Sequence, residues 1–446
     1  MKSSRLAAAA FAACLLAAPA ASANGRIPAS SYIAFSPSDP SFVVARVTFG
    51  MLVSRDAGQS WDWVCEQSIG YNGPEDPAIA IFQSNTVVAT LASGLVQSPD
   101  RGCNFAFAPA PIPQKFFIDV AVRKTDAQVG YALLSAYAGA EDDAGALLFT
   151  TQVYRSGDNG GSWAKVGADL DPKILGETID VAESDPSRLY LSSIRGSGDA
   201  VVASLYVSTD AGLAWTERAI PLERGERAAF IAAVDPKVAD VLYVRTTASA
   251  DQGARLLVSR DAGKTWETKF RSQGALLGFA LSADGSKVWI GGPKDGLHAA
   301  STADFAFAQR HKAQIQCLAV AGDGKLWACS NEASGFTLGL SPDEGASFTS
   351  KMHLHEVRGP LACPSGATAD KCVPLWGDQK KALGIEPPGD AGANADGGAR
   401  PPGGGGGGGG GDDCNCSTPG SGGLSAGVAV CAVFVALGLA RRKRAR

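Results

Sequence analysis

Two aspartates offer this chain its most direct route to catalysis. Asp119 in Phe117-Ile-Asp-Val and Asp180 in Ile179-Asp-Val occupy equivalent places in two β-branched runs, which puts them on neighbouring strands. Two carboxylates roughly 5–9.5 Å apart can cleave a glycosidic bond. An aspartate at such a place also commonly accepts hydrogen bonds from backbone amides. We therefore keep Asp119 and Asp180 as catalytic candidates and expect a structural or ligand-binding role for them.

Two histidines raise the question of a metal. His353 and His355 would lie on one face of a strand, a spacing that can hold a metal ion. The sequence suggests no third ligand, and it has only 4 histidines. It also has no Gly-rich phosphate loop before a helix. We expect surface histidines, no metal and no cofactor.

A repeated turn organises the chain around these residues. Ser259-Arg-Asp-Ala-Gly-Lys-Thr-Trp266 is one of six copies of Ser-x-Asp-x-Gly-x-x-aromatic. Ser and Asp side chains can accept backbone N–H bonds in a tight turn, Gly supplies a positive φ, and the aromatic side chain can be buried. The defining residues are Ser54, Asp56, Gly58 and Trp61; Ser98, Asp100, Gly102 and Phe105; Ser156, Asp158, Gly160 and Trp163; Ser208, Asp210, Gly212 and Trp215; Ser259, Asp261, Gly263 and Trp266; and Ser341, Asp343, Gly345 and Phe348.

Strand signals around each turn predict the fold class. Each copy follows two apolar or β-branched runs, and one further run enters the turn while another leaves it. Four short strands per repeat are typical of a β-propeller blade. The blades are expected at 32–66, 78–108, 117–166, 178–218, 229–270, 276–310 and 314–351. The sequence thus predicts an all-β, single seven-bladed propeller. Six or eight blades remain open because the sixth turn, Ser301-Thr-Ala-Asp-Phe305, lacks the Gly, and no helix is expected between residues 24 and 377.

The repeated turn resembles the Asp-box, or BNR repeat, of sialidases, sortilin-type ectodomains, some glucanases and photosystem-assembly propellers. This resemblance implies that the turns lie on the outer hairpins and that their aspartates are structural. Arg26-Ile-Pro28 is similar to a sialidase motif. A sialidase also needs a late tyrosine nucleophile paired with glutamate, but the last tyrosine here is Tyr243. The glucanases divide their acids between two propellers, and this chain has one.

The first 23 residues have the pattern of a secretory signal peptide. Lys2 and Arg5 precede an apolar run, and Ala21-Ser-Ala23 forms a small-residue cleavage site. A lipoprotein cleavage box ending at Cys14 is the alternative. We therefore expect an exported chain that begins near Asn24.

The other end of the chain predicts a tether and a membrane segment. Residues 377–413 form a Pro/Gly-rich linker without the surface needed to fold. Residues 414–446 contain Cys414 and Cys416, an apolar run over 424–440 expected to form a helix, and an Arg-rich tail. This end resembles the MYXO-CTERM sorting signal, which implies cleavage by a dedicated protease and anchoring at the cell surface through Cys414 or Cys416. An ordinary single-pass anchor is the alternative.

Charge and cysteine content restrict partner and compartment. Without the basic residues of the two terminal segments, 33 of the 40 basic residues remain against 44 acidic ones. The exported part therefore has a net charge near −11, which argues against nucleic acid as a partner. Exported cysteines can form disulfides. We expect Cys317 to pair with Cys329 across a hairpin, Cys363 with Cys372 across a short loop, and Cys65 with Cys103 between blades.

Together these patterns predict four segments: a signal peptide (1–23), a propeller (24–376), a linker (377–413) and a sorting segment (414–446). The expected function is binding of a protein or glycan by a monomeric, surface-tethered propeller, through loops on one face. A glycan-active hydrolase that uses Asp119 and Asp180 is the alternative. A structural spacer without a concave site is a third possibility.

Overall fold

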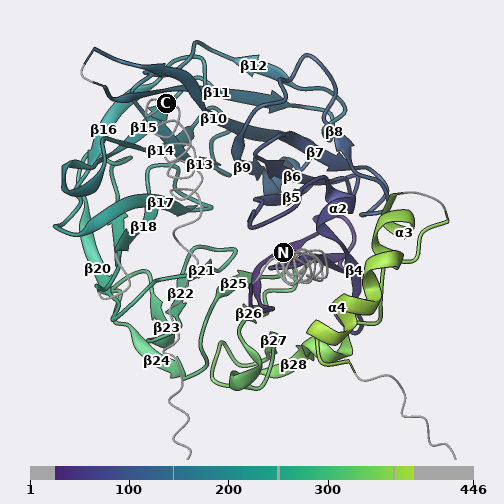
Figure 1. Cartoon of the computed structure of the whole chain (residues 1–446). Coiled ribbons are helices and arrows are strands. Elements are labelled where there is room, and N and C mark those ends of the chain that lie inside the picture. The colour runs from purple at the N-terminus through teal and green to yellow at the C-terminus, as the bar shows by residue number, and fades with distance from the viewer. Residues whose placement is uncertain (1–25, 144, 249–251, 365–366, 386–446) are drawn as a thin grey trace, which may run out of the picture.

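The computed structural model describes residues 26–143, 145–248, 252–364 and 367–385. Seven four-stranded antiparallel sheets surround a central axis, as Figure 1 shows, so the predicted seven-bladed propeller is confirmed. The predicted signal peptide, most of the linker, Cys414, Cys416 and the apolar run lie outside the described residues. No helix within the described ranges is long and apolar enough to cross a bilayer.

Each blade is formed by consecutive strands. Blade 1 contains β1 (Ser30–Phe35), β2 (Val43–Val47), β3 (Gly50–Ser54) and β4 (Asp62–Val64); blade 2, β5 (Ile79–Ile81), β6 (Val87–Leu91), β7 (Gly94–Ser98) and β8 (Ala106–Phe107); blade 3, β9 (Phe117–Val122), β10 (Gly130–Glu141), β11 (Leu147–Ser156) and β12 (Ala164–Val166). Blade 4 contains β13 (Leu175–Val181), β14 (Leu189–Arg195), β15 (Val202–Ser208) and β16 (Thr216–Ile220); blade 5, β17 (Glu226–Val234), β18 (Leu242–Ala248), β19 (Arg255–Ser259) and β20 (Glu267–Arg271). Blade 6 contains β21 (Gly278–Leu281), β22 (Lys287–Gly292), β23 (Gly296–Ser301) and β24 (Ala308–His311); blade 7, β25 (Cys317–Val320), β26 (Leu326–Cys329), β27 (Leu338–Ser341) and β28 (Thr349–Met352).

The first strand of each blade lies innermost, where it contacts the first strands of both neighbouring blades. The hydrophobic core is therefore divided among the spaces between blades. One cluster, for example, joins Tyr131 and Leu133 of blade 3 to Ile179 and Leu191 of blade 4. Such β-branched and aromatic side chains pack well between two pleated sheets. Radial packing of this kind positions the inner strands around the axis.

The antiparallel chain path gives the propeller two distinct faces. The first-to-second and third-to-fourth strand connections lie on one face, which carries the repeated Ser-Asp turns; we call it the turn face. The second-to-third connections and the links between blades lie on the other, which we call the loop face. The longest hairpin of the loop face joins β10 to β11, whose pairing extends to Glu141 opposite Leu147.

The six Ser-Asp turns share one hydrogen-bonding pattern. In the first, Ser54 Oγ accepts the amide of Gly58 at 2.8 Å, and Asp56 Oδ1 accepts the amide of Ser60 at 2.9 Å. Gly58 has φ +79°, and a Cβ there would overlap the Trp327 ring. Ala57 before it also has a positive φ, +59°. All six turns thus contain a non-glycine residue in the left-handed region, which the sequence motif did not reveal.

The aromatic residues that end the turns are not equally buried. Trp61 and Trp163 are fully buried, while Phe105, Trp215, Trp266 and Phe348 are only half-buried. The expectation that every aromatic ring is buried therefore holds for two copies. The fourth strand is the outermost of its blade, so solvent reaches one side of the ring unless a neighbouring segment covers it.

The described residues 353–364 and 367–385, here called the strap, connect the end of blade 7 to blade 1. The strap runs beside β4: the Trp63 amide donates to Gly359 O at 2.7 Å, and the Leu361 amide donates to Trp63 O at 2.8 Å. Arg358 also pairs with Asp62 at 2.6 Å. Figure 1 shows α3 (Ala367–Cys372) and α4 (Trp376–Ala382) of the strap at the outer edge of blade 1. The strap therefore braces the junction where the ring closes.

Short helices complete the described structure. Besides α3 and α4, they are α2 (Glu66–Ile69) and the single-turn helices η1 (Lys124–Asp126), η2 (Gly198–Ala200), η3 (Glu332–Ser334), η4 (Leu354–Glu356) and η5 (Val373–Leu375). The expectation of no helix between residues 24 and 377 is wrong for α2, α3 and the start of α4. The described residues also include 377–385, and Leu383 among them is buried against the blade 1 and blade 7 core.

All six expected cysteines form disulfides, but two pairings differ from the expectation. Cys317 pairs with Cys329, which lies directly opposite on β26, as predicted. The remaining bonds are Cys65–Cys372 and Cys103–Cys363, so the expected Cys363–Cys372 and Cys65–Cys103 pairs are wrong. The strap runs along the edges of blades 1 and 2 and presents its two cysteines to different blades. These disulfides indicate an oxidising compartment.

Candidate functional site

Strand register separates the two candidate acids. Asp119 lies opposite Leu133, the fourth residue of β10, whereas Asp180 lies opposite Tyr190, the second residue of β14. In both blades, the first residue of the second strand lies opposite the serine of that blade's Ser-Asp turn. Positions counted from this residue can therefore be compared between the two blades. The residue equivalent to Asp119 is therefore Thr178. The expected equivalence of the two aspartates is wrong by two positions, about 7 Å along a strand.

Backbone amides occupy both carboxylates. Asp119 Oδ2 accepts the Ile179 amide of blade 4 at 2.8 Å, and its Oδ1 accepts the Val120 amide at 2.9 Å. Asp180 Oδ1 accepts the Val181 amide at 2.8 Å. Burial raises the pKa of Asp119 to about 7 and that of Asp180 to about 6, although these amide bonds act in the opposite direction. Asp119 thus joins blade 3 to blade 4.

A third inner acid, Glu177, was not singled out by its sequence. It occupies a β-bulge in β13, between Gly176 and Thr178, and is 4% exposed. No hydrogen bond or ion pair to its carboxyl group occurs within the part of the chain that the structure describes. Burial raises its pKa to about 8. The only available signal was a glutamate inside an otherwise apolar strand run, Leu175-Gly-Glu-Thr-Ile.

Glu177 should make the stability of the protein fall as pH rises. Its folded-state pKa of about 8 exceeds the ordinary value of 4.5, so unfolding releases its proton between these pH values. Glu177→Gln removes this effect. We expect the variant to match the wild type at pH 4 and to gain roughly 2–4 kcal/mol in unfolding free energy at pH 9. Urea unfolding between pH 4 and pH 9 measures this gain, with a substitution at an exposed position, Glu141→Gln, as the control. Equal gains in unfolding free energy at pH 4 and pH 9 would contradict a raised pKa of Glu177.

Inner arginines serve mainly to join blades. Arg46, at the same level as Asp119, donates to the carbonyls of Asp76 and Pro77 at 3.0 and 2.9 Å, and its guanidinium lies 5.7 Å from the centre of the Tyr32 ring. Arg245 takes the equivalent place in blade 5 and donates to the carbonyls of Leu276 and Leu277.

Arg26, from the sialidase-like Arg-Ile-Pro segment, is also paired. Its Nη2 donates to both carboxylate oxygens of Asp76, at 2.7 and 2.9 Å. With Arg46 bound to backbone carbonyls, the two arginines do not present a cradle for a ligand carboxylate. This arrangement lends no support to sialidase chemistry.

The two strap histidines stack on one another. Their ring centres are 5.3 Å apart, and His353 Nδ1 lies 2.7 Å from Glu332 Oε2. Within the described ranges, no group of three or more His, Cys, Asp and Glu side chains is arranged to hold a metal ion.

Two hollows on the surface of the described residues have linings that do not include the inner acids. The first, of about 490 Å³, lies at the turn face and is lined by Arg55, Asp100, Arg101, Cys103, Asn104 and Pro364. The second, of about 390 Å³, lies between blades 5 and 6 at the loop face and is lined by Phe270, Arg271, Gln273, Lys294, Asp295, His298 and Gln309. Neither hollow includes Asp119 or Asp180.

No protein-family model matches the chain, and no curated protein sequence matches it significantly. Solved structures do resemble it. An ancestral GH74 enzyme has a TM-score of 0.55 and 17% identity, over 74% of this chain and 47% of that enzyme, so the chain spans about half of that enzyme's length.

Other solved structures are more distant. YCF48 from Cyanidioschyzon merolae has a TM-score of 0.45 and 13% identity, over 68% of this chain and 93% of its own. A Hadza microbial sialidase has a TM-score of 0.41 and 14% identity, over 68% of this chain and 73% of its own. At 17% identity, the likeness to the GH74 enzyme is one of fold.

Proposed function

We propose that the protein is an exported propeller that binds a protein or glycan on its loop face and does not cleave it. The placement of the inner acids carries this proposal. Asp119 and Asp180 lie at different levels of adjacent strands, and backbone amides bind both carboxylates. Glycoside hydrolysis needs two carboxyl groups that face one substrate bond from opposite sides. The amide bonds account for these aspartates as structural residues instead.

The loop face offers the better surface for a ligand. The β10–β11 hairpin extends beyond its blade, and Tyr137 on it is 49% exposed. On the neighbouring blade, Val202 at the start of β15 is 55% exposed. Exposed aromatic and apolar side chains on connecting loops commonly contribute to binding. Both residues lie on the same face as the hollow between blades 5 and 6.

We further propose that the propeller is a monomer held at the outer surface of the cell. The disulfides support an oxidising compartment. The polyglycine linker would act as a flexible spacer, and Cys414 or Cys416 would carry the anchor after the apolar segment is processed. The net charge near −11 supports a partner other than nucleic acid.

A second candidate function is glycoside hydrolysis. It is favoured by one observation: burial raises the pKa of Asp119 to about 7 and that of Asp180 to about 6, values that suit acid–base chemistry near neutral pH. In this alternative, one of the two aspartates would protonate the leaving group.

Paired surface variants test which face binds. The purified protein is applied to a glycan array, and binding of the wild type is compared with that of Tyr137→Ser/Val202→Ser. Leu213→Ser/Val238→Ser is the matched control, because these residues are 64% and 51% exposed in turn-face connections. We expect the loop-face variant to weaken binding at least tenfold and the control to leave it unchanged. Loss of binding in the control alone would show that the ligand binds the turn face and would contradict the proposal.

A further inference from the structure

The hollow between blades 5 and 6 combines features of a small-ligand site. Its walls come from β20, from the link between the two blades, from the β22–β23 turn and from the outer strands of blade 6. Its volume of about 390 Å³ lies in the range of small-molecule sites. No motif in the sequence pointed to these residues.

Asp295 is buried in this hollow with half of its carboxylate unused. The residue is 6% exposed, and its Oδ1 accepts the Gln273 amide at 2.7 Å. Its Oδ2 is buried and has no hydrogen-bond partner among the residues described. Asp295 ends the tight turn between Gly292 and Gly296, which lie opposite each other on β22 and β23. The hydrogen bond from the Gln273 amide orients the carboxylate and leaves Oδ2 as its unused atom.

His298 provides a second unmatched polar atom. It lies opposite Gln309 on the neighbouring strand, and its Nδ1 is buried without a partner in the described part of the chain. Burial lowers the pKa of His298, which favours the neutral imidazole with one donor and one acceptor nitrogen. The Phe270 ring lies 5.1 Å from it, centre to centre, and adds an apolar wall.

These groups together restrict the chemistry of a ligand. An unmatched buried polar atom destabilises the unbound protein, and a ligand that hydrogen-bonds the atom removes this penalty. Asp295 Oδ2 can only accept, so the ligand must donate. Arg271 and Lys294 line the hollow and disfavour an ammonium donor, whereas Asp295 disfavours a simple anion. Hydroxyl groups on a compact ring with an apolar face meet all of these conditions.

We propose that this hollow binds one pyranose ring of a glycan. Asp295 and His298 turn toward the ring, so that Oδ2 and Nδ1, which have almost no accessible surface in the unbound protein, bond its adjacent hydroxyls while its C–H face lies on Phe270. The inference rests on the proposed binding function and names a glycan as the ligand class. A single ring held by two such bonds is expected to bind with a Kd of about 1 mM. A longer glycan would gain further contacts across the loop face.

Saturation-transfer NMR on the full mature protein tests this proposal. The probes are methyl β-D-glucopyranoside, methyl α-D-mannopyranoside and methyl β-D-galactopyranoside, with cyclohexanol as the ring control. We expect transfer to at least one glycoside and not to cyclohexanol. Asp295→Asn keeps the oxygen that accepts the Gln273 amide but replaces the unused oxygen by an NH2 donor. We expect this variant to bind the glycoside at least tenfold more weakly. His298→Phe keeps a ring of similar shape and should do the same.

Asp323→Asn, an exposed position in a turn-face connection of blade 7, is the control and should bind as the wild type does. Absence of transfer to all three glycosides, or unchanged binding in both Asp295→Asn and His298→Phe, would overturn the proposal. If array glycans still bind to those two variants, the hollow assignment fails while the binding function stands. If glycosides bind at the hollow but are cleaved, the hollow assignment stands and the proposed function fails.

Discussion

Removing both disulfides of the strap, by Cys→Ala at Cys65, Cys103, Cys363 and Cys372, is expected to lower the free energy of unfolding by about 8–10 kcal/mol. The cross-linked residues are 307 and 260 positions apart. Chain entropy gives about 5–6 kcal/mol for closing one loop of that length. The second bond then closes an effective loop of roughly 50 residues, from Cys65 to Cys103 and from Cys363 to Cys372, and adds about 4 kcal/mol. A loss of this size equals the whole stability of many proteins.

Guanidinium unfolding measures this effect in three proteins: the variant without both strap bonds, a variant without Cys65–Cys372 alone, and a Cys317→Ala/Cys329→Ala control. The control bond spans only 12 positions, so the same reasoning gives about 3 kcal/mol. Removing Cys65–Cys372 alone should cost about 4 kcal/mol, because Cys103–Cys363 still holds the strap. A control loss equal to the loss from both strap bonds would show that ring closure does not depend on the strap.

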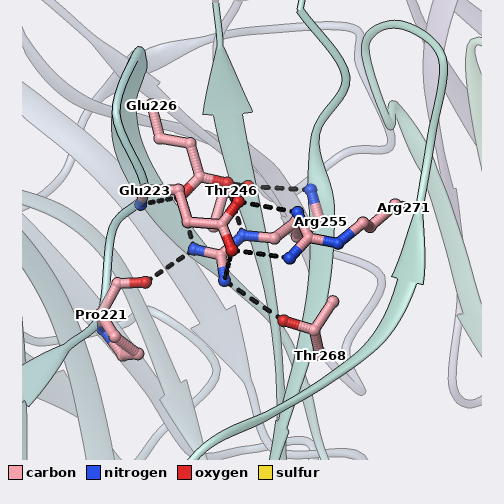
Figure 2. A network of polar contacts seen from close by, with 7 residues as sticks. All are labelled: Pro221, Glu223, Glu226, Thr246, Arg255, Thr268 and Arg271. Carbon is pink, nitrogen blue, oxygen red and sulfur yellow. Dashed lines mark hydrogen bonds and ion pairs between the residues drawn. The ribbon is translucent and has the colours of Figure 1, made fainter.

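Arg255→Leu is expected to lower the free energy of unfolding by about 3–5 kcal/mol, because it leaves a buried carboxylate without its cation. Figure 2 shows the Arg255 guanidinium between Glu226 and Glu223. Arg255 donates to Glu226 at 2.5 and 2.8 Å, and the two side chains are 6% and 4% exposed. Thr246 and the Pro221 carbonyl complete the network, at 2.6 Å from Glu226 and from Arg255, respectively.

Arg271→Leu is the matched control. Arg271 pairs with Glu223 in the same network, but both side chains are about half exposed, so the change should cost only about 0–1 kcal/mol. Urea unfolding at pH 7 compares the two variants. Equal losses would mean that burial of the Arg255–Glu226 pair does not determine its contribution.

The loss in Arg255→Leu should also depend on pH. Burial alone would raise the pKa of Glu226, but hydrogen bonds from Arg255 and Thr246 outweigh it and hold the pKa below the ordinary value of 4.5. In the wild type this stabilisation is present above pH 4.5 and is lost as pH falls through the lower folded-state pKa. Without Arg255 the carboxyl group can protonate more readily. The difference between the two proteins should therefore shrink below pH 4.5.

The blades could be predicted from sequence because each is a local unit. Four consecutive strands and one Ser-Asp turn form every blade that has the full motif, so the repeat marks the architecture directly. Even blade 6 was recognisable from Gly278-Phe-Ala-Leu and Lys287-Val-Trp-Ile, although its turn lacks the Gly. The strap was not predictable in this way. Its cysteines pair with residues 260 and 307 positions away, and local spacing contains no information on such pairs.

The candidate site was harder to predict than the fold. Asp119 and Asp180 share an Ile-Asp-Val context, but pairing with the second strand places Asp119 at the fourth level and Asp180 at the second level from the Ser-Asp turn, which a one-letter pattern does not record. Asp295 and His298 come from a turn and a strand whose unmatched atoms are evident only once blade 5 packs beside them. These residues are of interest because polar atoms in them are buried without a hydrogen-bond partner, and this property exists only in the folded chain.

Product release by the mature protein is the most direct test of the central claim that this propeller binds without cleaving. An array-positive glycan is incubated with the wild type and with Asp119→Asn/Asp180→Asn, and mass spectrometry follows both the intact glycan and its fragments. We predict that the glycan remains intact with both proteins and that both bind it with similar affinity. Fragments formed by the wild type and absent with the double variant would contradict the claim and identify a hydrolase.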